Sequence, residues 1–340
     1  MGLFGGKTIL VTGGTGSFGG YFVDYLLDKN FQEIRIFSRD ELKQEEMRLR
    51  FQNSKIKFYI GDVRDRGSVD DAMPGVDYVF HAAALKQVPS CEFFPMQAMQ
   101  TNVVGSKNVI DSAVSHGASR VVSLSTDKAV YPVNSLGITK ALMEKVVQST
   151  SRKLSEGQTV LSLVRYGNVL FSRGSVIPLF MKLIREKKPL TVTDLGMSRF
   201  LLPLKEAINL VGFALENGKQ GDIFVRTAPA CSIGDLAQAL KNIFYSDSEI
   251  QAIGMRHGEK THETLVSQEE LTRAEDMGDY LRLSMDNRDL NYNKYLSEGD
   301  KKFDKIKDYT SQNTVRLTIK EIEEMLLNQP EIISELNQKK

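Results

Sequence analysis

The sequence predicts an α/β fold in which a doubly wound parallel sheet is joined by a smaller α/β lobe. Two observations predict it. Short runs rich in Val and Ile recur through the first half of the chain and alternate with segments of helical spacing. The runs are apolar on both faces, which is typical of strands buried in a parallel, Rossmann-like sheet. In chain order they are KTILVTG, EIRIFS, IKFYIGD, DYVFHAA, RVVSLST and TVLSLVRYG.

The rhythm of strands and helices breaks between residues 170 and 205, and strand runs become sparse after about residue 228. This change predicts a second lobe that closes over the sheet and binds substrate. We assign residues 1–168, with parts of 200–228, to the nucleotide-binding domain and residues 169–199 and 229–300 to this lobe.

The last segment, residues 301–340, is predicted to be a helical extension. Thr318 and Glu321 have the spacing of a capping box, in which each residue satisfies a free amide at the start of a helix. We expect this peripheral extension to serve packing or oligomer contact.

The composition excludes several classes of function. The 340 residues hold 44 Lys and Arg against 43 Asp and Glu, and this net charge of +1 excludes the broad positive field that nucleic-acid binding needs. Cys91 and Cys231 stand far apart without a metal-binding motif, so we expect no disulfide, no metal site and a reducing, cytoplasmic location. No apolar run reaches the roughly 18 residues of a membrane span, so no membrane association is expected.

A glycine-rich turn follows the first strand run and opens a helical segment. Gly13, Gly16 and Gly19 let the backbone approach a pyrophosphate, whose charge is then met by the helix N-terminus. Because this turn stands at the first strand-helix junction of a repeating pattern, it favours dinucleotide binding over a simple tight turn. The residues between the glycines are expected to contact the cofactor as well: Thr15, Ser17 and Phe18.

The end of the second strand run indicates which dinucleotide binds. Ser38 and Arg39 are the first residues past the apolar run, and a hydroxyl beside a guanidinium suits the 2′-phosphate of NADP. Asp40 would favour NAD if the strand ended one residue later, and a solvated turn of mixed charge is the remaining alternative. After the third run, Asp62 is positioned to bond the adenine amine, with Val63 beside it.

The stretch STDKAVYPVNSLGITK follows the fifth strand run and concentrates groups that move protons. Thr126 offers a hydroxyl, Asp127 a carboxyl and Lys128 an amine, and Lys140 adds a second cation. An exposed turn pair after a strand is the alternative for Asp127 and Lys128, and an exposed helix lysine is the alternative for Lys140.

With these residues in view, the chain resembles an extended short-chain dehydrogenase/reductase. Within that family it is similar to the inverting UDP-N-acetylglucosamine 4,6-dehydratases of capsule and flagellin glycan pathways. The similarity covers nearly the whole chain, and Asp127-Lys128 separates this group from sugar 4-epimerases of the same fold. The motifs are TGGTGSFG, IFSRDELKQ, GDVRD, HAAALKQVPSCEFFP, NVVGSKNV, STDKA, RYGNV, SRGSVIPLF, MSRF, RHGEKTHETL and EDMGDY.

The resemblance implies a UDP-sugar substrate, oxidation of its C4 hydroxyl, loss of the C6 hydroxyl as water and inversion at C5. Lys128 would take the C5 proton if burial and positive neighbours lower its pKa, and Asp127 would protonate the leaving oxygen if its own pKa is raised. Lys140 would hold the nicotinamide ribose. Two alternatives remain open: a UDP-sugar 4-epimerase on the same scaffold, and a noncatalytic NADP-binding regulator.

Leu136 departs from the family pattern, because a tyrosine usually stands four residues before the lysine. Three hypotheses account for it: another group or a water deprotonates the C4 hydroxyl, Tyr131 supplies the phenol, or no turnover occurs. Retention of both Asp127 and Lys128 argues against the last.

Further site residues follow from the resemblance. Arg256 and Glu259 have the spacing expected for a diphosphate and a uridine ribose contact, with a surface ion pair as the alternative, while His257 is expected to be exposed. Relatives form oligomers, including hexamers, so a homo-oligomer is expected. The remaining expected cofactor contacts are Ala82, Ala83, Asn102, Tyr166 and Asn168, and the remaining substrate contacts are Lys86, Asn168, Arg173, Ser175, Val176 and Arg199.

Overall fold

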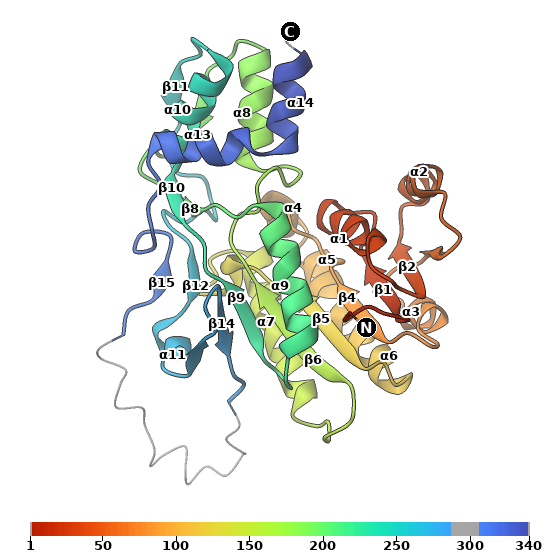
Figure 1. Cartoon of the computed structure of the whole chain (residues 1–340). Coiled ribbons are helices and arrows are strands. Elements are labelled where there is room, and N and C mark those ends of the chain that lie inside the picture. Colours follow the sequence, from red (N-terminus) through yellow and green to blue (C-terminus); the bar gives the residue numbers. More distant parts are fainter. Residues whose placement is uncertain (1, 287–305, 339–340) are drawn as a thin grey trace.

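The computed structural model describes residues 2–286 and 306–338 (Figure 1). Within this part of the chain, a nine-stranded sheet has the order β13-β14-β9-β6-β5-β4-β1-β2-β3, and the seven strands from β9 to β3 run parallel. The predicted doubly wound α/β fold is therefore confirmed, and each of the six apolar runs forms a strand. These are β1 (Thr8–Thr12), β2 (Glu33–Ser38), β3 (Ile56–Ile60), β4 (Tyr78–His81), β5 (Arg120–Leu124) and β6 (Val160–Arg165), with β9 (Ile223–Arg226) beside β6.

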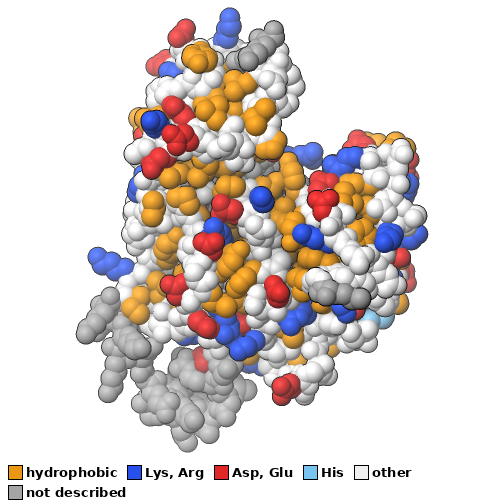
Figure 2. Space-filling view, in the orientation of Figure 1, with side chains coloured by type: hydrophobic (Ala, Val, Ile, Leu, Met, Phe, Trp, Pro, Cys, Tyr) orange, Lys and Arg blue, Asp and Glu red, His pale blue; other side chains and the backbone are white. Residues whose placement is uncertain are grey.

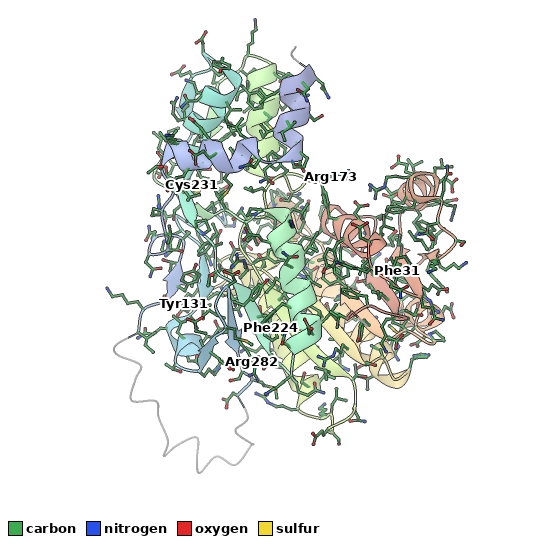
Figure 3. The ribbon with its side chains drawn as sticks, in the orientation of Figure 1. Phe31, Tyr131, Arg173, Phe224, Cys231 and Arg282 are labelled. Atoms are coloured by element: carbon green, nitrogen blue, oxygen red, sulfur yellow. The ribbon has the colours of Figure 1, made fainter. Side chains whose placement is uncertain are left out.

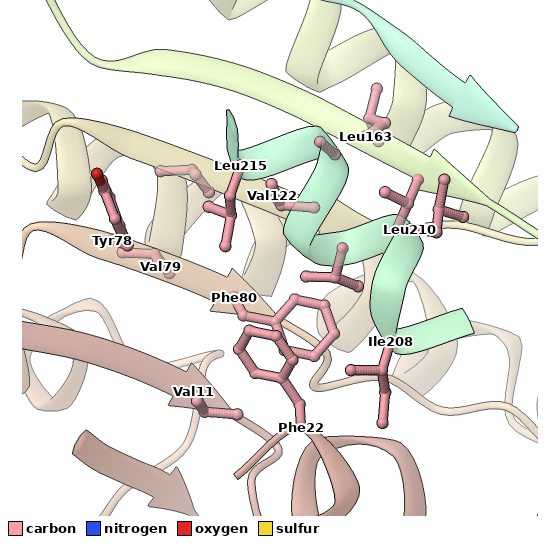
Figure 4. Packing of buried hydrophobic residues seen from close by; sticks show 14 of the residues in the cluster. Val11, Phe22, Tyr78, Val79, Phe80, Val122, Leu163, Ile208, Leu210 and Leu215 are labelled. Carbon is pink, nitrogen blue, oxygen red and sulfur yellow. The ribbon is translucent and has the colours of Figure 1, made fainter. Parts of the chain in front are cut away.

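Helices cover both faces of the sheet, which explains why the central strands are apolar on both sides. Every residue of β1 and β4 is buried. On one face, α1 (Ser17–Leu27) and α9 (Leu204–Asn217) pack together, and on the other lie α3 (Arg66–Ala72), α6 (Gly105–Ser115) and α7 (Ser135–Ser151). Figure 4 shows the first layer, where the rings of Phe22 and Phe80, 4.7 Å apart, lie beside Ile208 of α9.

The edge of the main sheet corrects the predicted division of the chain. Strands β13 (Ala274–Asp276) and β14 (Tyr280–Leu283) were assigned to the second lobe, but they extend the main sheet because β14 pairs antiparallel with β9. The ring of Tyr280 stacks on Phe213 of α9 at 4.3 Å, and Leu283 belongs to the main core. Residues 287–300 of the predicted lobe lie outside the described residues.

A second hydrophobic core lies above the sheet in Figure 1, among α8 (Val176–Arg185), α10 (Ile233–Phe244), α13 (Ile319–Leu327) and α14 (Pro330–Gln338). The predicted capping box is present at the start of α13, where the Thr318 hydroxyl accepts from the Glu321 amide. The extension is not peripheral, since Ile322 and Leu326 are fully buried in this core. Nor is it wholly helical, because β15 (Tyr309–Thr310) pairs with β12 (Thr264–Val266), and residues 301–305 lie outside the described residues.

Short elements complete the fold. Strand β7 (Leu190–Val192) pairs with β11 (Ile250–Ala252), and β8 (Ser198–Phe200) pairs with β10 (Ala230–Ser232). The other helices are α2 (Glu41–Phe51), α4 (Val88–Phe93), α5 (Pro95–Met99), η1 (Gln100–Val104), η2 (Asp127–Ala129) and α11 (Gln268–Leu271). Cys91 and Cys231 are buried free thiols. None of the helices in residues 2–286 and 306–338 has the length and apolar character to cross a bilayer. Acidic and basic side chains are interspersed on the face drawn in Figure 2.

Candidate active site

A cavity of about 1190 Å³ lies between the carboxyl ends of the parallel strands and the second lobe. Ligands of open α/β sheets bind at this end of the strands. Figure 3 labels Arg173 in the loop that leads from the sheet to α8, on the second lobe's side of this cavity. The predicted site residues that line it are Gly13, Thr15, Gly16, Ser17, Phe18, Gly19, Ser38, Arg39, Asp62, Val63, Ala82, Ala83, Lys86, Thr126, Lys128, Lys140, Tyr166, Asn168, Arg173, Ser175, Val176, Arg199, Arg256 and Glu259.

The glycine turn packs too closely for side chains. Gly13 has a φ of +67°, and a Cβ there would lie 2.8 Å from the backbone of Ala83. A Cβ on Gly19 would lie 2.4 Å from the Gly13 carbonyl oxygen. The N-cap of α1 is Gly16, and no described side chain caps that helix. Its first amides can therefore donate hydrogen bonds to the phosphates of a dinucleotide.

The end of β2 has the groups predicted for a 2′-phosphate. Ser38 is the last residue of the strand, one position later than its predicted end, and its hydroxyl accepts from Gln44 at 3.1 Å. Arg39 has a half-exposed side chain, 3.5 Å from a carboxylate oxygen of Asp62. Asp40 caps α2 by accepting from the Lys43 amide at 3.1 Å. The carboxylate that would favour NAD is thus engaged by its own helix.

The reactive cluster, by which we mean Asp127, Lys128, Glu263 and Arg199, lies past the end of β5. The Lys128 amine lies 3.0 Å from Asp127 Oδ1 and 3.8 Å from Glu263 Oε1. Thr126 donates to Asp127 Oδ1 at 2.8 Å. Asp127 Oδ2 and Glu263 Oε2 are buried and have no hydrogen-bond partner among the described residues. A lysine between two carboxylates, each with a free oxygen, can pass protons to a bound molecule.

The charges of the cluster do not meet the condition stated for Lys128 as a base, which was a lowered pKa. Burial and the charge of Arg199 act to lower the pKa of Lys128, but Asp127 and Glu263 outweigh them and the pKa is raised. Burial raises the pKa of Glu263 in spite of Lys128.

Glu263 was missed in the sequence, although it stands four residues after Glu259 within RHGEKTHETL. It is 3% exposed, lines the cavity and precedes β12. Lys260 was missed too; it lines the cavity and donates to the Val130 carbonyl at 2.7 Å. The available signal was the density of charged residues in this motif, but nothing in the sequence places residue 263 beside residue 128.

Two predicted contacts do not line the cavity. Asp127 is fully buried behind Lys128 and is absent from the lining within the described chain. Asn102, expected to contact the cofactor, is also absent from that lining. Its amide bonds both backbone groups of Leu85, at 2.8 and 3.0 Å, and the Thr139 hydroxyl at 3.1 Å. Asn102 therefore positions a loop and a helix.

Helix α7 places Lys140 and Leu136 beside the cavity. Lys140 donates to the Leu124 carbonyl at 2.7 Å, and burial lowers its pKa to about 8. Leu136 is 4% exposed and packs with Cys91. Tyr131 cannot replace the missing phenol, because it is 55% exposed, does not line the described cavity and donates to Asp308 at 3.1 Å (Figure 3).

On the side of the second lobe, Arg256 lies 3.6 Å from Glu259, which also accepts from Thr193 at 2.8 Å. Arg256 and Glu259 therefore form the ion pair that was the alternative interpretation, and both also line the cavity. The His257 side chain is 87% exposed, in agreement with the prediction. Ser175 stands at the N-cap position of α8 without a side-chain capping bond, and its hydroxyl oxygen is buried.

Two buried polar atoms without described partners lie at the cavity. The Ser175 hydroxyl oxygen and the Asn168 amide oxygen are buried without a partner in the described residues, and both residues line the cavity. Such atoms normally have partners, so they fit a site built to bind a polar molecule. Lys86 adds positive character, and burial and the charge of Arg173 lower its pKa.

Comparison with known proteins places the chain in a family. The model of the family described as polysaccharide biosynthesis protein matches residues 9–285, and that of its C-terminal region matches residues 286–332. The chain therefore belongs to the polysaccharide biosynthesis protein family. Proteins from Rickettsia typhi and Rickettsia canadensis, both named UDP-glucose 4-epimerase, are 55% and 56% identical to it. The alignments cover 98% and 96% of this chain, and 99% and 96% of the relatives.

Solved structures agree with the fold. Pen from Bacillus thuringiensis is 34% identical with a TM-score of 0.87, over 96% of this chain and 100% of that one. DesIV from Streptomyces venezuelae, a dTDP-glucose 4,6-dehydratase, has a TM-score of 0.68 at 22% identity, over 75% of this chain and 86% of that one, and shows the fold alone. These matches support the resemblance to the extended short-chain dehydrogenase/reductases, and several of the proteins matched are named for action on nucleotide sugars.

Proposed function

We propose that this protein is an NADP-dependent UDP-N-acetylglucosamine 4,6-dehydratase that inverts C5. The observation that carries the proposal is Lys128 between the buried carboxyls of Asp127 and Glu263 at the cavity. Dehydration removes a proton from C5 and expels an oxygen from C6, so it needs a base and an acid side by side. Oxidation and reduction at C4 alone need no such pair.

The cofactor half of the cavity suits NADP. The uncapped start of α1 would receive the pyrophosphate, and Ser38 and Arg39 would receive the 2′-phosphate. Lys140 would hold the nicotinamide ribose, and Asp62 the adenine. NADP, when bound, supplies the chemistry of taking a hydride from C4 of the sugar and delivering it to C6.

The residues on the other side bind and orient the sugar nucleotide. We propose that Arg256 and Arg173 meet the diphosphate, because a guanidinium matches phosphate oxygens bidentately, and that Glu259 accepts from the uridine ribose. Lys128 removes the C5 proton. The second lobe, with α8 at the cavity, excludes water from the sugar, and this division of labour between the two lobes is part of the proposal.

We propose that the protein forms a homo-oligomer and acts in the cytoplasm, and an exposed apolar patch supports the first of these two proposals. Phe93, Phe94 and Met96 are 81%, 63% and 59% exposed on neighbouring α4 and α5. Large apolar side chains clustered on a surface mark contacts between proteins. The number of subunits is open, with a hexamer among the options.

A UDP-sugar 4-epimerase is the second candidate, because relatives more than 50% identical over nearly the whole chain carry that name. Incubation with UDP-N-acetylglucosamine in heavy water, followed by NMR, separates the two. A C6 methyl group with deuterium at C5 of an L-configured 4-keto sugar supports the dehydratase. A C4 epimer supports the second candidate, and a bound but unchanged sugar supports a regulator.

The choice of cofactor has its own test. We expect NADP to bind at least tenfold more tightly than NAD in a competition measurement, since about 1.4 kcal/mol from one charged contact gives that ratio. Arg39→Ala should remove most of the difference, and equal affinities in the unaltered protein would refute the assignment.

A further inference from the structure

We propose that Glu263 is the catalytic acid that protonates the leaving C6 oxygen, and that it forms a proton-exchange pair with Lys128, while Asp127 positions Lys128. This inference rests on the proposed dehydration. It reassigns the acid that the sequence placed at Asp127 to a residue 136 positions further along the chain.

The two acids of the reactive cluster differ in their access to the cavity. Lys128 and Glu263 both line the cavity, whereas Asp127 does not, within the described residues. Asp127 Oδ1 already accepts from Thr126 at 2.8 Å and lies 3.0 Å from the Lys128 amine. A group that donates to a substrate must reach it within hydrogen-bond distance. Asp127 is therefore placed to hold Lys128, and Glu263 is the acid of the cluster that can meet the sugar.

No described group forms a hydrogen bond with the Glu263 carboxyl. Arg199 approaches Oε1 only to 3.7 Å, and its guanidinium donates instead to the carbonyls of Ser198 at 2.7 Å and Lys260 at 2.9 Å. Lys128 lies 3.8 Å from the same oxygen. The second oxygen, Oε2, is buried and unpartnered among the described residues. A carboxyl kept in this state in a cavity is available to donate a proton.

The charges around Glu263 and Lys128 determine which of the two groups carries the proton. The groups that face Glu263 are Lys128, Asp127, Arg199 and Lys260, and burial together with Asp127 raises its pKa although the three cations lower it. The pKa of Lys128 is also raised, so the resting lysine is an ammonium that cannot act as a base. In the substrate complex, the Lys128 amine must approach Glu263 Oε1 from 3.8 Å to hydrogen-bond distance, and transfer of one proton then yields a neutral amine and a neutral acid. A sugar that excludes water favours this neutral pair.

The elimination then balances. In a sugar already oxidised at C4, the C5–H bond breaks and its proton goes to the Lys128 amine. The C5–H electron pair forms the C5–C6 double bond, and the C6–O bond breaks with its electrons on oxygen. That oxygen takes the Glu263 proton and leaves as water. Lys128 is now an ammonium and Glu263 a carboxylate, which is the resting state.

The experiment compares the unaltered protein with Glu263→Gln in the heavy-water NMR assay with UDP-N-acetylglucosamine. We expect Glu263→Gln to lose about 10²- to 10⁴-fold in the rate of C6 oxygen loss, the usual contribution of a general acid. UDP and NADP affinities should stay within about threefold of the unaltered protein, which shows that the cavity is intact. Glu263→Asp should recover part of the rate, because it restores an acid.

A second readout does not depend on turnover. Isotope-labelled glutamate allows NMR titration of the Glu263 carboxyl carbon, assigned by its absence in Glu263→Gln. We expect a pKa above the ordinary value of about 4.3, and a further rise in Lys128→Met because one cation is removed. A pKa at or below the ordinary value would overturn the exchange pair.

The outcomes separate the two proposals. Dehydration at an undiminished rate by Glu263→Gln overturns the role of Glu263 and leaves the proposed function standing. A C4 epimer from the unaltered protein overturns both, because an epimerase expels no oxygen from C6. Dehydration by the unaltered protein together with the expected loss in Glu263→Gln supports both.

Discussion

Two buried clusters in this fold each set one cation between two carboxylates, and they differ in how fully the charges are paired. In the first, the Arg165 guanidinium bonds Glu144 at 2.6 and 3.1 Å, Glu270 at 2.9 and 3.0 Å, and the Leu265 carbonyl at 2.8 Å. In the reactive cluster, Lys128 lies 3.0 and 3.8 Å from its two acids.

The difference shows how a fold separates stability from chemistry. All the acid oxygens around Arg165 have close partners, so that cluster can only hold β6, α7 and α11 together. In the reactive cluster, two acid oxygens have no hydrogen-bond partner among the described residues. The cluster lies next to a cavity in which a bound ligand could provide such partners. Complete pairing indicates a structural role, and incomplete pairing at a cavity indicates a catalytic one.

Lys128→Met gives the largest expected effect and tests the catalytic side of the comparison. The substitution keeps the volume of the side chain and removes its proton, so we expect dehydration to fall by about 10²- to 10⁴-fold. NADP binding should be unchanged, since the cofactor contacts lie elsewhere. The measurement is product formation by NMR beside cofactor titration, and undiminished product would remove the lysine from the mechanism.

Arg165→Met tests the structural side. It leaves two acids facing each other in the core, so we expect the free energy of unfolding to fall by about 3–5 kcal/mol, measured by denaturant unfolding. Adding Glu144→Gln to this variant should recover part of the loss, because it removes one uncompensated charge. A loss below about 1 kcal/mol would mean that the cluster does not stabilise the fold.

Lys140→Met tests a buried cation that has no carboxylate within bonding distance among residues 2–286 and 306–338. Because its pKa is lowered to about 8, the unfolded chain binds more protons than the folded one between pH 8 and about 10.5. Stability contributed by this lysine therefore rises with pH across that window, by up to about 3 kcal/mol. In denaturant unfolding at a series of pH values, the Met variant should lack this rise, and parallel curves for both proteins would contradict the lowered pKa.

The sequence predicted the fold and the tight glycine turn better than it predicted the reactive cluster, for a physical reason. The strands carry a local signal of apolar residues on both faces, and Gly13 and Gly19 are required by contacts within one turn and its neighbouring strand. Glu263 and Lys128 meet only because β12 lies beside η2 in the tertiary structure. Local patterns do not encode that contact.

Two questions that the sequence left open are answered by tertiary contacts. The pKa of Lys128 is raised by Asp127, its neighbour in the chain, and by Glu263, which only the fold brings near. Tyr131 has the right chemistry in the right stretch, yet its positive φ of 46° and its bond to Asp308 place the phenol away from the cavity. Residue type was predictable in both cases, and the direction of the side chain was not.

Ser125→Ala gives the smallest expected effect and tests whether the two clusters act separately. Ser125 precedes Thr126, and its hydroxyl donates to Glu144 Oε1 at 2.5 Å, so it joins the reactive turn to the Arg165 cluster. Loss of a hydrogen bond to a charged group should lower the free energy of unfolding by about 1–2 kcal/mol. Ser123→Ala is the matched control, because Ser123 lies on β5 two residues before Ser125 and its buried hydroxyl has no partner among the described residues.

If the clusters are separate, Ser125→Ala should change the dehydration rate by less than about threefold while it lowers stability. The reason is that Lys128 and Glu263 keep all their contacts when the Ser125 hydroxyl is removed. A rate loss of tenfold or more, with Ser123→Ala unaffected, would show that Arg165 and its acids also set the position of the reactive turn. The comparison would then describe one continuous network whose structural half tunes its catalytic half.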